Sequence, residues 1–345
     1  MRARIIATVG PACASRPILR RLVMEGVSVF RLNFSHGTHD QHAEFVKRIR
    51  SIQRELVAPI SIMQDLAGHR IRTGRLKGGK EVVLAPGQKF ALYRGAAPGT
   101  SKGVSIDYEG AFERIRRGQM VYIADGTIQL RVVRSTPDRL DTIVTEEGKL
   151  GERKGVNIPH APLEFPPISL KDIEDLTFAV QHRLEFVAQS FVRSAAEVLQ
   201  VKRRLLNALP NSRVIAKIET PEGIKNIASI LRVADGIMVA RGDLGITVPI
   251  HEVPILQKWI IAACNHVKKP AITATQMLEH MQDHPLPTRA EVSDVANAVI
   301  DGSDYLMLSG ETASGKYPIE AVHMMRKTIE FTERHAPYRG VRRNR

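Results

Sequence analysis

Charged side chains that could carry out phosphoryl chemistry follow directly on short apolar segments of the sequence. Lys217 and Glu219 lie two positions apart at the end of one segment, and residues two apart on a strand point to the same side. Asp243 follows a later segment, and two carboxylates are the hard oxygen ligands that suit Mg²⁺ or Mn²⁺, with substrate oxygens completing the shell. Arg31 and Lys217 would then supply positive charge to a phosphoryl group. These are the residue types of phosphoryl transfer, in which catalysis is mostly positioning and charge stabilisation.

Further polar residues follow the other apolar segments. They are Asn33, Ser35 and His36, then Asp65 beside Leu66, Gly242 beside Asp243, Thr275, and Glu311. A helix cap or a polar group at the rim of a barrel could explain each of them singly, but six segments that all end this way indicate a shared site. The sequence from Gly242 to Gly245 is typical of a turn that opens a short helix, whose free N–H groups would hold a carboxylate or a phosphate.

These residues can meet only if the preceding segments are strands of one sheet. Short β-branched runs alternate with amphipathic stretches of helical period. The predicted strands are Arg4–Val9, Val27–Asn33, Ile60–Leu66, Glu185–Ser190, Arg213–Ile218, Gly236–Ala240, Pro270–Thr273 and Asp304–Leu308. The predicted helices are Ser15–Glu25, His39–Glu55, Leu170–His182, Ser194–Ala208, Glu222–Leu231, Val253–Val267, Thr288–Ile300 and Pro318–Arg334. Eight such units favour an α/β fold that closes as a (β/α)8 TIM barrel, with an open doubly wound sheet as the alternative.

The alternation is interrupted between residues 74 and 158. Short alternating segments and turn pairs such as Asp125-Gly126 indicate a small antiparallel β unit there. It is inserted after strand 3, on the face where such barrels keep their active sites, which suggests a lid that excludes water. We therefore predict a discontinuous barrel domain of residues 1–73 and 159–338, a lid domain of residues 74–158, and a basic tail of residues 339–345.

Composition limits the classes of partner. The chain has 345 residues and a formal net charge of +14, with 43% apolar and 25% charged residues, which is ordinary for a soluble protein. No apolar run approaches the roughly 18 residues of a membrane span. A basic surplus indicates anionic partners, although no nucleic-acid module accompanies Lys202-Arg203-Arg204 or the arginine-rich end, so we expect no nucleic-acid partner. Two distant cysteines favour the reducing cytoplasm, and the N-terminal apolar stretch is short for a signal peptide.

Six segments resemble the signature segments of the pyruvate kinase family. They are RLNFSH (31–36), AKIE (216–219), ARGDLG (240–245), ATQMLE (274–279), PTRAEVSD (287–294) and LSGET (308–312), in the order of the family and across nearly the whole chain. The resemblance implies a TIM barrel with a small β-barrel lid after strand 3. It also implies transfer of the phosphoryl group of phosphoenolpyruvate to ADP, giving ATP and pyruvate, with Mg²⁺ or Mn²⁺ as cofactor.

The resemblance assigns roles to the matching residues. Lys217 would stabilise the charge on the phosphoryl group in flight, and Arg31 would bind that phosphate. The amides of Gly242 and Asp243 would receive the substrate carboxylate, and Thr275 would help to deliver a proton to the enolate carbon. Glu219 would hold the divalent metal together with Asp243. The nucleotide would be bound by Asn33, His36, Arg72 and Lys154.

The segment after the third strand departs from the family pattern. Many members read Asp-Thr-Lys-Gly-Pro-Glu-Ile-Arg there, whereas this chain has Asp65-Leu-Ala-Gly-His-Arg-Ile-Arg72. In the family an acidic residue at the position of Arg70 accompanies dependence on K⁺, and a basic one accompanies independence. We therefore predict that K⁺ is not required; the candidate ligands for a monovalent ion are Asn33, Ser35, Asp65 and the Leu66 carbonyl.

The end of the sequence and the altered segment leave two further expectations. Typical members continue into a C-terminal domain with a sugar-phosphate effector site and much of the tetramer interface, so we expect no regulation through that site and a homo-oligomer without that interface. The altered segment from Leu66 to Arg70 keeps open a related barrel enzyme that acts on another enolpyruvate or 2-oxo acid. A non-catalytic binding protein descended from the kinase is the third hypothesis.

Overall fold

The computed structural model describes residues 3–124, 126–159, 161 and 163–336. Asp125 of the predicted Asp125-Gly126 turn and the predicted basic tail lie outside the described residues. The chain divides into two units. The barrel unit comprises the residues up to 68, residues 168–244, and those from 251 onward, and the β unit comprises residues 69–167 and 245–250.

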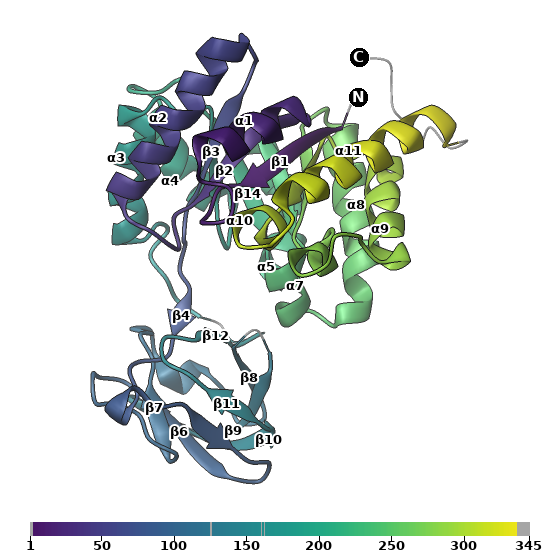
Figure 1. The fold of residues 1–345 in the computed structure, drawn as a ribbon. Coiled ribbons are helices and arrows are strands. Elements are labelled where there is room, and N and C mark those ends of the chain that lie inside the picture. Colours follow the sequence, from purple (N-terminus) through teal and green to yellow (C-terminus); the bar gives the residue numbers. More distant parts are fainter. Residues whose placement is uncertain (1–2, 125, 160, 162, 337–345) are drawn as a thin grey trace. The chain divides into compact units, whose positions relative to one another are not determined.

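Eight parallel strands form a closed barrel in the barrel unit (Figure 1). Around the barrel they are β1 (Arg4–Thr8), β17 (Tyr305–Leu308), β16 (Ala271–Ala274), β15 (Gly236–Ala240), β14 (Arg213–Ile218), β13 (Phe186–Gln189), β3 (Ser61–Asp65) and β2 (Val27–Asn33). The parallel pairing of Arg4 with Tyr305 joins β1 to β17 and leaves the sheet without an edge. The predicted TIM barrel is confirmed, and the open doubly wound sheet is wrong.

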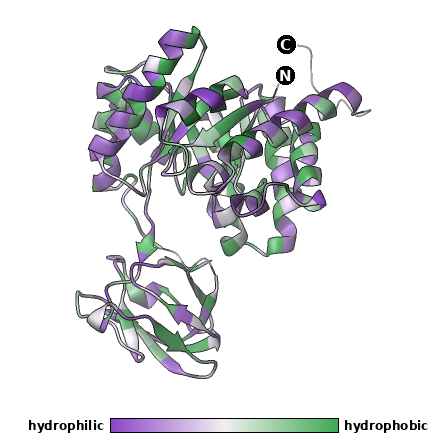
Figure 2. Ribbon diagram, in the orientation of Figure 1, coloured by the Kyte–Doolittle hydropathy of each residue, from purple (hydrophilic) through white to green (hydrophobic). Residues whose placement is uncertain are grey.

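Helices connect the strands. They are α1 (Arg16–Met24), α2 (His39–Leu56), α3 (Leu170–Gln181), α4 (Ala195–Leu205), α5 (Pro221–Lys225), α6 (Ile227–Val233), α7 (Arg241–Thr247), α8 (Val253–His266), α9 (Arg289–Asp301), α10 (Gly310–Ala313) and α11 (Pro318–His335). Figure 2 shows hydrophobic residues along the strands and hydrophilic residues distributed over the helices. None of the helices within the described part of the chain is both long and apolar enough to cross a membrane.

Apolar side chains from alternate strand positions fill a core cluster of the barrel. The cluster comprises Ile6, Val29, Met63, Phe186, Ala188, Ile215, Met238, Ile272, Ala274, Tyr305 and Met307. Phe186 and Tyr305 pack edge to face, with 6.2 Å between ring centroids. Because side chains pack the inside, as is usual in such barrels, polar groups that act on a ligand are expected at the ends of the strands.

Two elements differ from the sequence-based expectation. The predicted helix Glu222–Leu231 is two short helices, α5 and α6, that meet at Asn226. The Asn226 amide donates to the backbone oxygen of Arg193 at 2.8 Å, a tertiary contact that local periodicity does not reveal. The strand β16 begins at Ala271, after Pro270, because proline has no N–H to donate to a ladder.

The β unit is built around a seven-stranded sheet. Its order is β4 (Ile71–Arg72), β12 (Gly155–Asn157), β8 (Met120–Ile123), β9 (Ile128–Thr136), β10 (Arg139–Glu146), β6 (Lys89–Tyr93) and β7 (Gly103–Ser105). A separate pair joins β5 (Val82–Leu84) to β11 (Gly148–Leu150). An isolated antiparallel bridge between Thr73 and Ile106 links the continuations of the two edge strands. That bridge closes the sheet on itself, in the manner of a small barrel.

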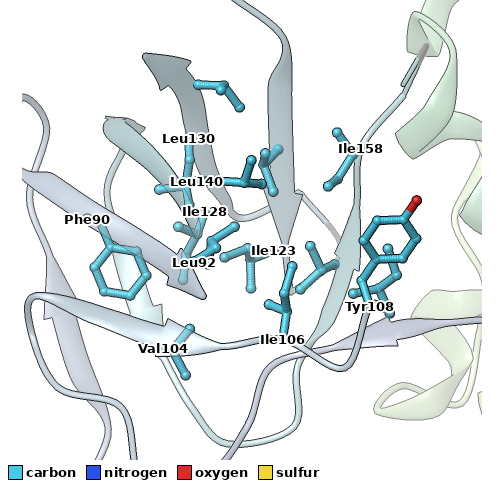
Figure 3. Close-up of a cluster of buried hydrophobic side chains, with 14 of the residues drawn as sticks. Phe90, Leu92, Val104, Ile106, Tyr108, Ile123, Ile128, Leu130, Leu140 and Ile158 are labelled. Atoms are coloured by element: carbon cyan, nitrogen blue, oxygen red, sulfur yellow. The ribbon is translucent and has the colours of Figure 1, made fainter. Parts of the chain in front are cut away.

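The closed sheet of the β unit encloses its own apolar core. Figure 3 shows Phe90 and Leu92 of β6, Val104 of β7, Ile106 just after β7 and Leu140 of β10 in one cluster, and all five are buried. The alternation of buried and exposed residues along β9 and β10 follows from a sheet with one apolar face. The apolar core of the β unit is thus separate from the core cluster of the barrel.

Candidate active site at the carboxyl ends of the barrel strands

Lys217 lies at the centre of a polar cluster formed by three neighbouring strands. Its Nζ is 3.1 Å from Asp65 Oδ1, at the end of β3, and donates to Ser190 Oγ, directly after β13, at 2.7 Å. It also lies 3.1 Å from Oε1 of Glu219, which follows β14. The lysine side chain is only 10% exposed. Because β3, β13 and β14 are adjacent in the barrel, their ends bring these four residues together.

Arg31 joins the cluster from β2 through the same aspartate. Its Nε lies 2.6 Å from Asp65 Oδ2, and its Nη1 donates to Thr8 Oγ1 at 3.1 Å. One buried carboxylate therefore holds two cations, one on each oxygen. The three charges sum to +1, and the neighbouring Glu219 offsets this charge only when it is ionised and not itself bound to a cation.

The pKa shifts of Asp65 and Lys217 agree with a cluster in which both side chains are charged. Burial alone would raise the pKa of Asp65, but the charges of Lys217 and Arg31 outweigh it and hold the pKa below its usual value. Burial alone would likewise lower the pKa of Lys217, but the Asp65 and Glu219 carboxylates outweigh it and raise the pKa. Lys217 is thus cationic and Asp65 anionic at neutral pH.

Glu219 is a fully buried carboxylate whose ionisation is opposed. Its Oε2 accepts the N–H of Phe191 at 2.6 Å, and Phe191 has a left-handed backbone with φ of 54°. Burial, together with the negative charge of Asp243, raises the pKa of Glu219 to about 7 against the opposing positive charge of Lys217. An acid with such a pKa exchanges its proton near neutral pH and gains from a bound cation.

The donor set at Glu219 and Asp243 fits a divalent ion that keeps most of its shell. Both are hard carboxylate ligands, and their mutual repulsion is what a cation would relieve. Among the described residues no group of three or more His, Cys, Asp or Glu side chains could hold a metal. An ion here would therefore depend on water or substrate oxygens for its remaining ligands, which suits Mg²⁺ or Mn²⁺.

Thr275 stands at the end of β16 in a strained turn. Thr275 and Gln276 have consecutive positive φ values of 70° and 53°, although neither is glycine. The N–H of Gly242 donates to Thr275 Oγ1 at 2.8 Å, and this hydroxyl donates to the Ala274 oxygen at 2.6 Å. The predicted Gly242 and Thr275 therefore lie in direct contact, and a carboxylate at the Gly242 amide would take the place of the Thr275 hydroxyl.

The loop after β2 is fixed by local hydrogen bonds. Asn33 Oδ1 accepts the Ser35 N–H at 3.1 Å, and the N–H of Phe34 donates to the backbone oxygen of Asp65 at 2.9 Å. The backbone oxygen of His36 accepts from His42 Nε2 at 2.9 Å. The four candidate ligands for a monovalent ion thus lie around the ends of β2 and β3. Oxygens of three of them, Asn33, Asp65 and Leu66, already accept hydrogen bonds.

Two contributors to the site have no predicted role. Ser190 donates to the backbone oxygen of Leu66 at 2.7 Å and accepts from Lys217. Its place at the end of a predicted strand is the feature of the sequence that could have indicated a role in the site. Arg241 lies in the segment ARGDLG (240–245), which resembles the family, and the sequence does not indicate its contacts. Arg72 and Lys154, predicted to bind nucleotide, belong to the β unit, where the Arg72 backbone N–H contacts Asp107 and the Lys154 N–H donates to Thr73 Oγ1 at 2.9 Å.

The family model and the similar proteins that match this chain all carry the same family name. A family model described as pyruvate kinase, barrel domain, matches residues 1–322. A pyruvate kinase of Sporosarcina psychrophila is 43% identical over 341 residues, covering 98% of this chain and 58% of that protein. One of Dictyostelium discoideum is 44% identical over 96% of this chain and 66% of its own length. One of Thermococcus litoralis is 41% identical over 99% of this chain and 72% of its own length. The chain thus spans from somewhat over half to nearly three quarters of these relatives.

Proposed function

Because the chain belongs to the pyruvate kinase family, we propose that it transfers the phosphoryl group of phosphoenolpyruvate to ADP and forms ATP and pyruvate. The observation that carries the proposal is the Arg31–Asp65–Lys217 arrangement, in which one buried acid holds two cations at the ends of adjacent strands. Such a site would stabilise an anionic group that is transferred from a donor to an acceptor. Glycolysis in the cytoplasm is the setting that we propose, in a homo-oligomer.

The chain's own residues would act on the phosphoryl group by position and charge. Arg31 binds the phosphate, and Lys217 stabilises the negative charge that spreads over the phosphoryl oxygens during transfer. Both cations are fixed by Asp65 before the substrate arrives, so little reorganisation is needed at the moment of reaction. Glu219 and Asp243 would hold the divalent cation, which when bound supplies positive charge to substrate oxygens.

The second half of the reaction requires a proton on the enolate carbon. Thr275 Oγ1 is the hydroxyl that we propose beside that carbon, with the amides of Gly242 and Asp243 receiving the substrate carboxylate. Asn33, His36, Arg72 and Lys154 are the residues that we propose for binding the nucleotide, and we propose residues 74–158 as a lid domain. Excluding water from the transfer is the expected benefit of a lid.

Acceptor dependence tests this proposal. Pyruvate release from phosphoenolpyruvate and Mg²⁺ is measured with ADP, with GDP and with no nucleotide. We expect pyruvate only when a nucleoside diphosphate is present, with an equal amount of nucleoside triphosphate. Release without an acceptor would instead indicate a phosphatase, and no release with any acceptor would favour another enolpyruvate or a binding role.

A divalent cation should stabilise the folded protein more at pH 8 than at pH 6. Because the pKa of Glu219 is about 7 in the folded state and 4.5 in the unfolded chain, the folded protein holds one more proton than the unfolded chain between these two pH values. The stability contributed by that proton is complete below pH 4.5 and is lost progressively as the pH rises to the folded pKa of about 7. Mg²⁺ competes with the same proton, so its binding strengthens over that interval.

Thermal unfolding with and without Mg²⁺ at both pH values measures this effect. We expect the rise in Tm to be larger at pH 8 by a few degrees, and Glu219→Gln to remove the difference. The exposed Glu222 offers a matched control, since Glu222→Gln should leave the difference between the two pH values unchanged. An equal Mg²⁺ effect at both pH values in the unaltered protein would contradict the assignment of Glu219 as a ligand.

We propose that activity does not require K⁺. Arg70 stands where an acidic residue accompanies K⁺ dependence, and oxygens of three candidate ligands for a monovalent ion already accept hydrogen bonds. Activity assayed with an organic cation in place of K⁺ and Na⁺ should be retained, and Arg70→Glu should create a dependence on K⁺. A large loss of activity in the unaltered protein that K⁺ restores would refute this expectation.

A further inference from the structure

The turn that presents Thr275 has a backbone that needs external support. Two consecutive residues, Thr275 with φ of 70° and Gln276 with φ of 53°, occupy the left-handed region. For residues with a Cβ this region is disfavoured, by about five- to thirtyfold in population for each residue. Strained backbone of this kind persists only where surrounding groups over-determine it, and it concentrates at functional sites. The supporting group should therefore be identifiable.

Arg241 binds the carbonyl oxygens of both left-handed residues. Its Nη2 lies 2.6 Å from the Thr275 oxygen and 3.0 Å from the Gln276 oxygen. Its Nε donates to the Thr275 oxygen as well, at 3.1 Å. In a left-handed turn successive carbonyls can point to one donor, and the planar guanidinium fork is able to bind both at once.

The guanidinium is itself fixed from the opposite side. Its Nη1 lies 2.6 Å from the Asp294 carboxylate on α9 and 3.2 Å from Gln257 Oε1 on α8. Gln257 is buried and is held in turn by Asp301 at 3.3 Å. The Arg241 side chain is only 11% exposed, so these contacts are largely protected from water. Arg241 thus links the Thr275–Gln276 turn to α8 and α9.

The residue after Arg241 contacts the threonine hydroxyl when no substrate is bound. The N–H of Gly242 donates to Thr275 Oγ1 at 2.8 Å. A substrate carboxylate at the Gly242 amide would displace this hydrogen bond, whereas the contacts of Arg241 with the turn would remain. We propose that Arg241 is a positioning residue, which keeps the Thr275–Gln276 turn left-handed and thereby sets where the Thr275 hydroxyl points. This inference rests on the function proposed above for Thr275.

The first test is Arg241→Lys, which keeps the charge beside Asp294 but cannot donate to two carbonyls with a planar fork. We expect kcat for pyruvate formation to fall about tenfold or more, with KM for phosphoenolpyruvate changed by less than about threefold. Exchange of the methyl hydrogens of pyruvate for deuterium, which probes the proton transfer alone, should fall with kcat. A kcat within about twofold of the unaltered protein would overturn the proposal.

The second test is rescue by glycine. Glycine adopts the left-handed region without strain, so Gln276→Gly should remove part of the need for Arg241. In the Arg241→Lys protein it should restore kcat about fivefold, whereas in the unaltered protein it should bring no gain. A loss of kcat in Arg241→Lys that Gln276→Gly leaves unchanged would also overturn the proposal, because it would place the effect elsewhere than in the turn.

A readout independent of catalysis separates this inference from the proposed reaction. Amide hydrogen exchange in peptides covering residues 272–282 should accelerate in Arg241→Lys and slow again in the double variant. This result decides the matter even if the unaltered protein forms no pyruvate. Arg326→Lys is the control, and it should change neither this exchange nor kcat. It alters an arginine of α11 that is bonded to Glu330 of the same helix and to Glu25 at the end of α1.

Asp294→Asn provides the variant that keeps the arginine in place. It weakens the support of Arg241 from α9 and should give a smaller loss of kcat and a smaller rise in exchange than Arg241→Lys. If Arg241→Lys does not fold, this variant carries the test. A folded Asp294→Asn protein with unchanged kcat and unchanged exchange in residues 272–282 would then overturn the proposal.

Discussion

Replacing Lys217 with methionine should lower kcat by about 10³-fold or more, because the ammonium group supplies positive charge that the phosphoryl oxygens need during transfer. The Nζ is fixed by Asp65 and Ser190 and is almost completely buried, so water cannot replace it at the same position. Methionine has a similar length and no charge. The measurement is pyruvate formation at saturating phosphoenolpyruvate, ADP and Mg²⁺.

The Lys217→Met protein should remain folded. Asp65 keeps its contact with Arg31, and Glu219 can take up a proton because its pKa is already about 7. The matched control is Lys225→Met, which removes an exposed lysine from α5 and should leave kcat unchanged. A folded Lys217→Met protein with a kcat within about tenfold of the unaltered protein would contradict the role of Lys217.

Asp65→Asn should reduce both stability and activity. Asparagine retains the shape of the side chain but leaves Arg31 and Lys217 close together without the buried anion that holds them. Breaking a buried ion pair by removing one partner costs about 3–5 kcal/mol of folding free energy. We expect kcat to fall about 10²-fold as well, since both cations lose their fixed positions.

Urea unfolding and kcat measure the two effects of Asp65→Asn. The pKa of Asp65 is lowered in the folded state, so its stabilisation is present above the unfolded value of 3.8 and is lost as pH falls through the folded pKa. The difference in stability should therefore shrink in strong acid. Glu55→Gln, at an exposed cluster with Arg16 and Arg20, should cost far less folding free energy than Asp65→Asn. Equal costs for the two substitutions would argue against Asp65 as the anchor.

The barrel could be predicted from the sequence because its strands are buried on both faces. Continuous apolar runs separated by amphipathic helices have few alternative arrangements, and the closed order from β1 to β17 confirms the prediction. The polar residues at the strand ends were predictable for the same reason, since a parallel barrel brings all of its carboxyl ends to one face. The break at Asn226 was not predictable, because it depends on a contact with Arg193.

The division of labour within the site could not be predicted from residue types. Asp65 was a candidate ligand of a monovalent ion, and only the register of β2, β3 and β14 shows that it contacts Arg31 and Lys217. The left-handed turn at Thr275 and Gln276 has neither glycine nor asparagine to indicate it. Arg241 has many acceptors within reach in a folded barrel, and its partners are known only when α8 and α9 are in place.

The most direct test of this account follows the phosphoryl group itself. Phosphoenolpyruvate, ADP and Mg²⁺ are incubated with the unaltered protein, and ATP and pyruvate are quantified together, with the Lys217→Ala protein run in parallel. We expect the two products to form in equal amounts with the unaltered protein and the alanine variant to form almost none. Unaltered protein that binds phosphoenolpyruvate and Mg²⁺ but forms neither product, or equal rates for the two proteins, would contradict it.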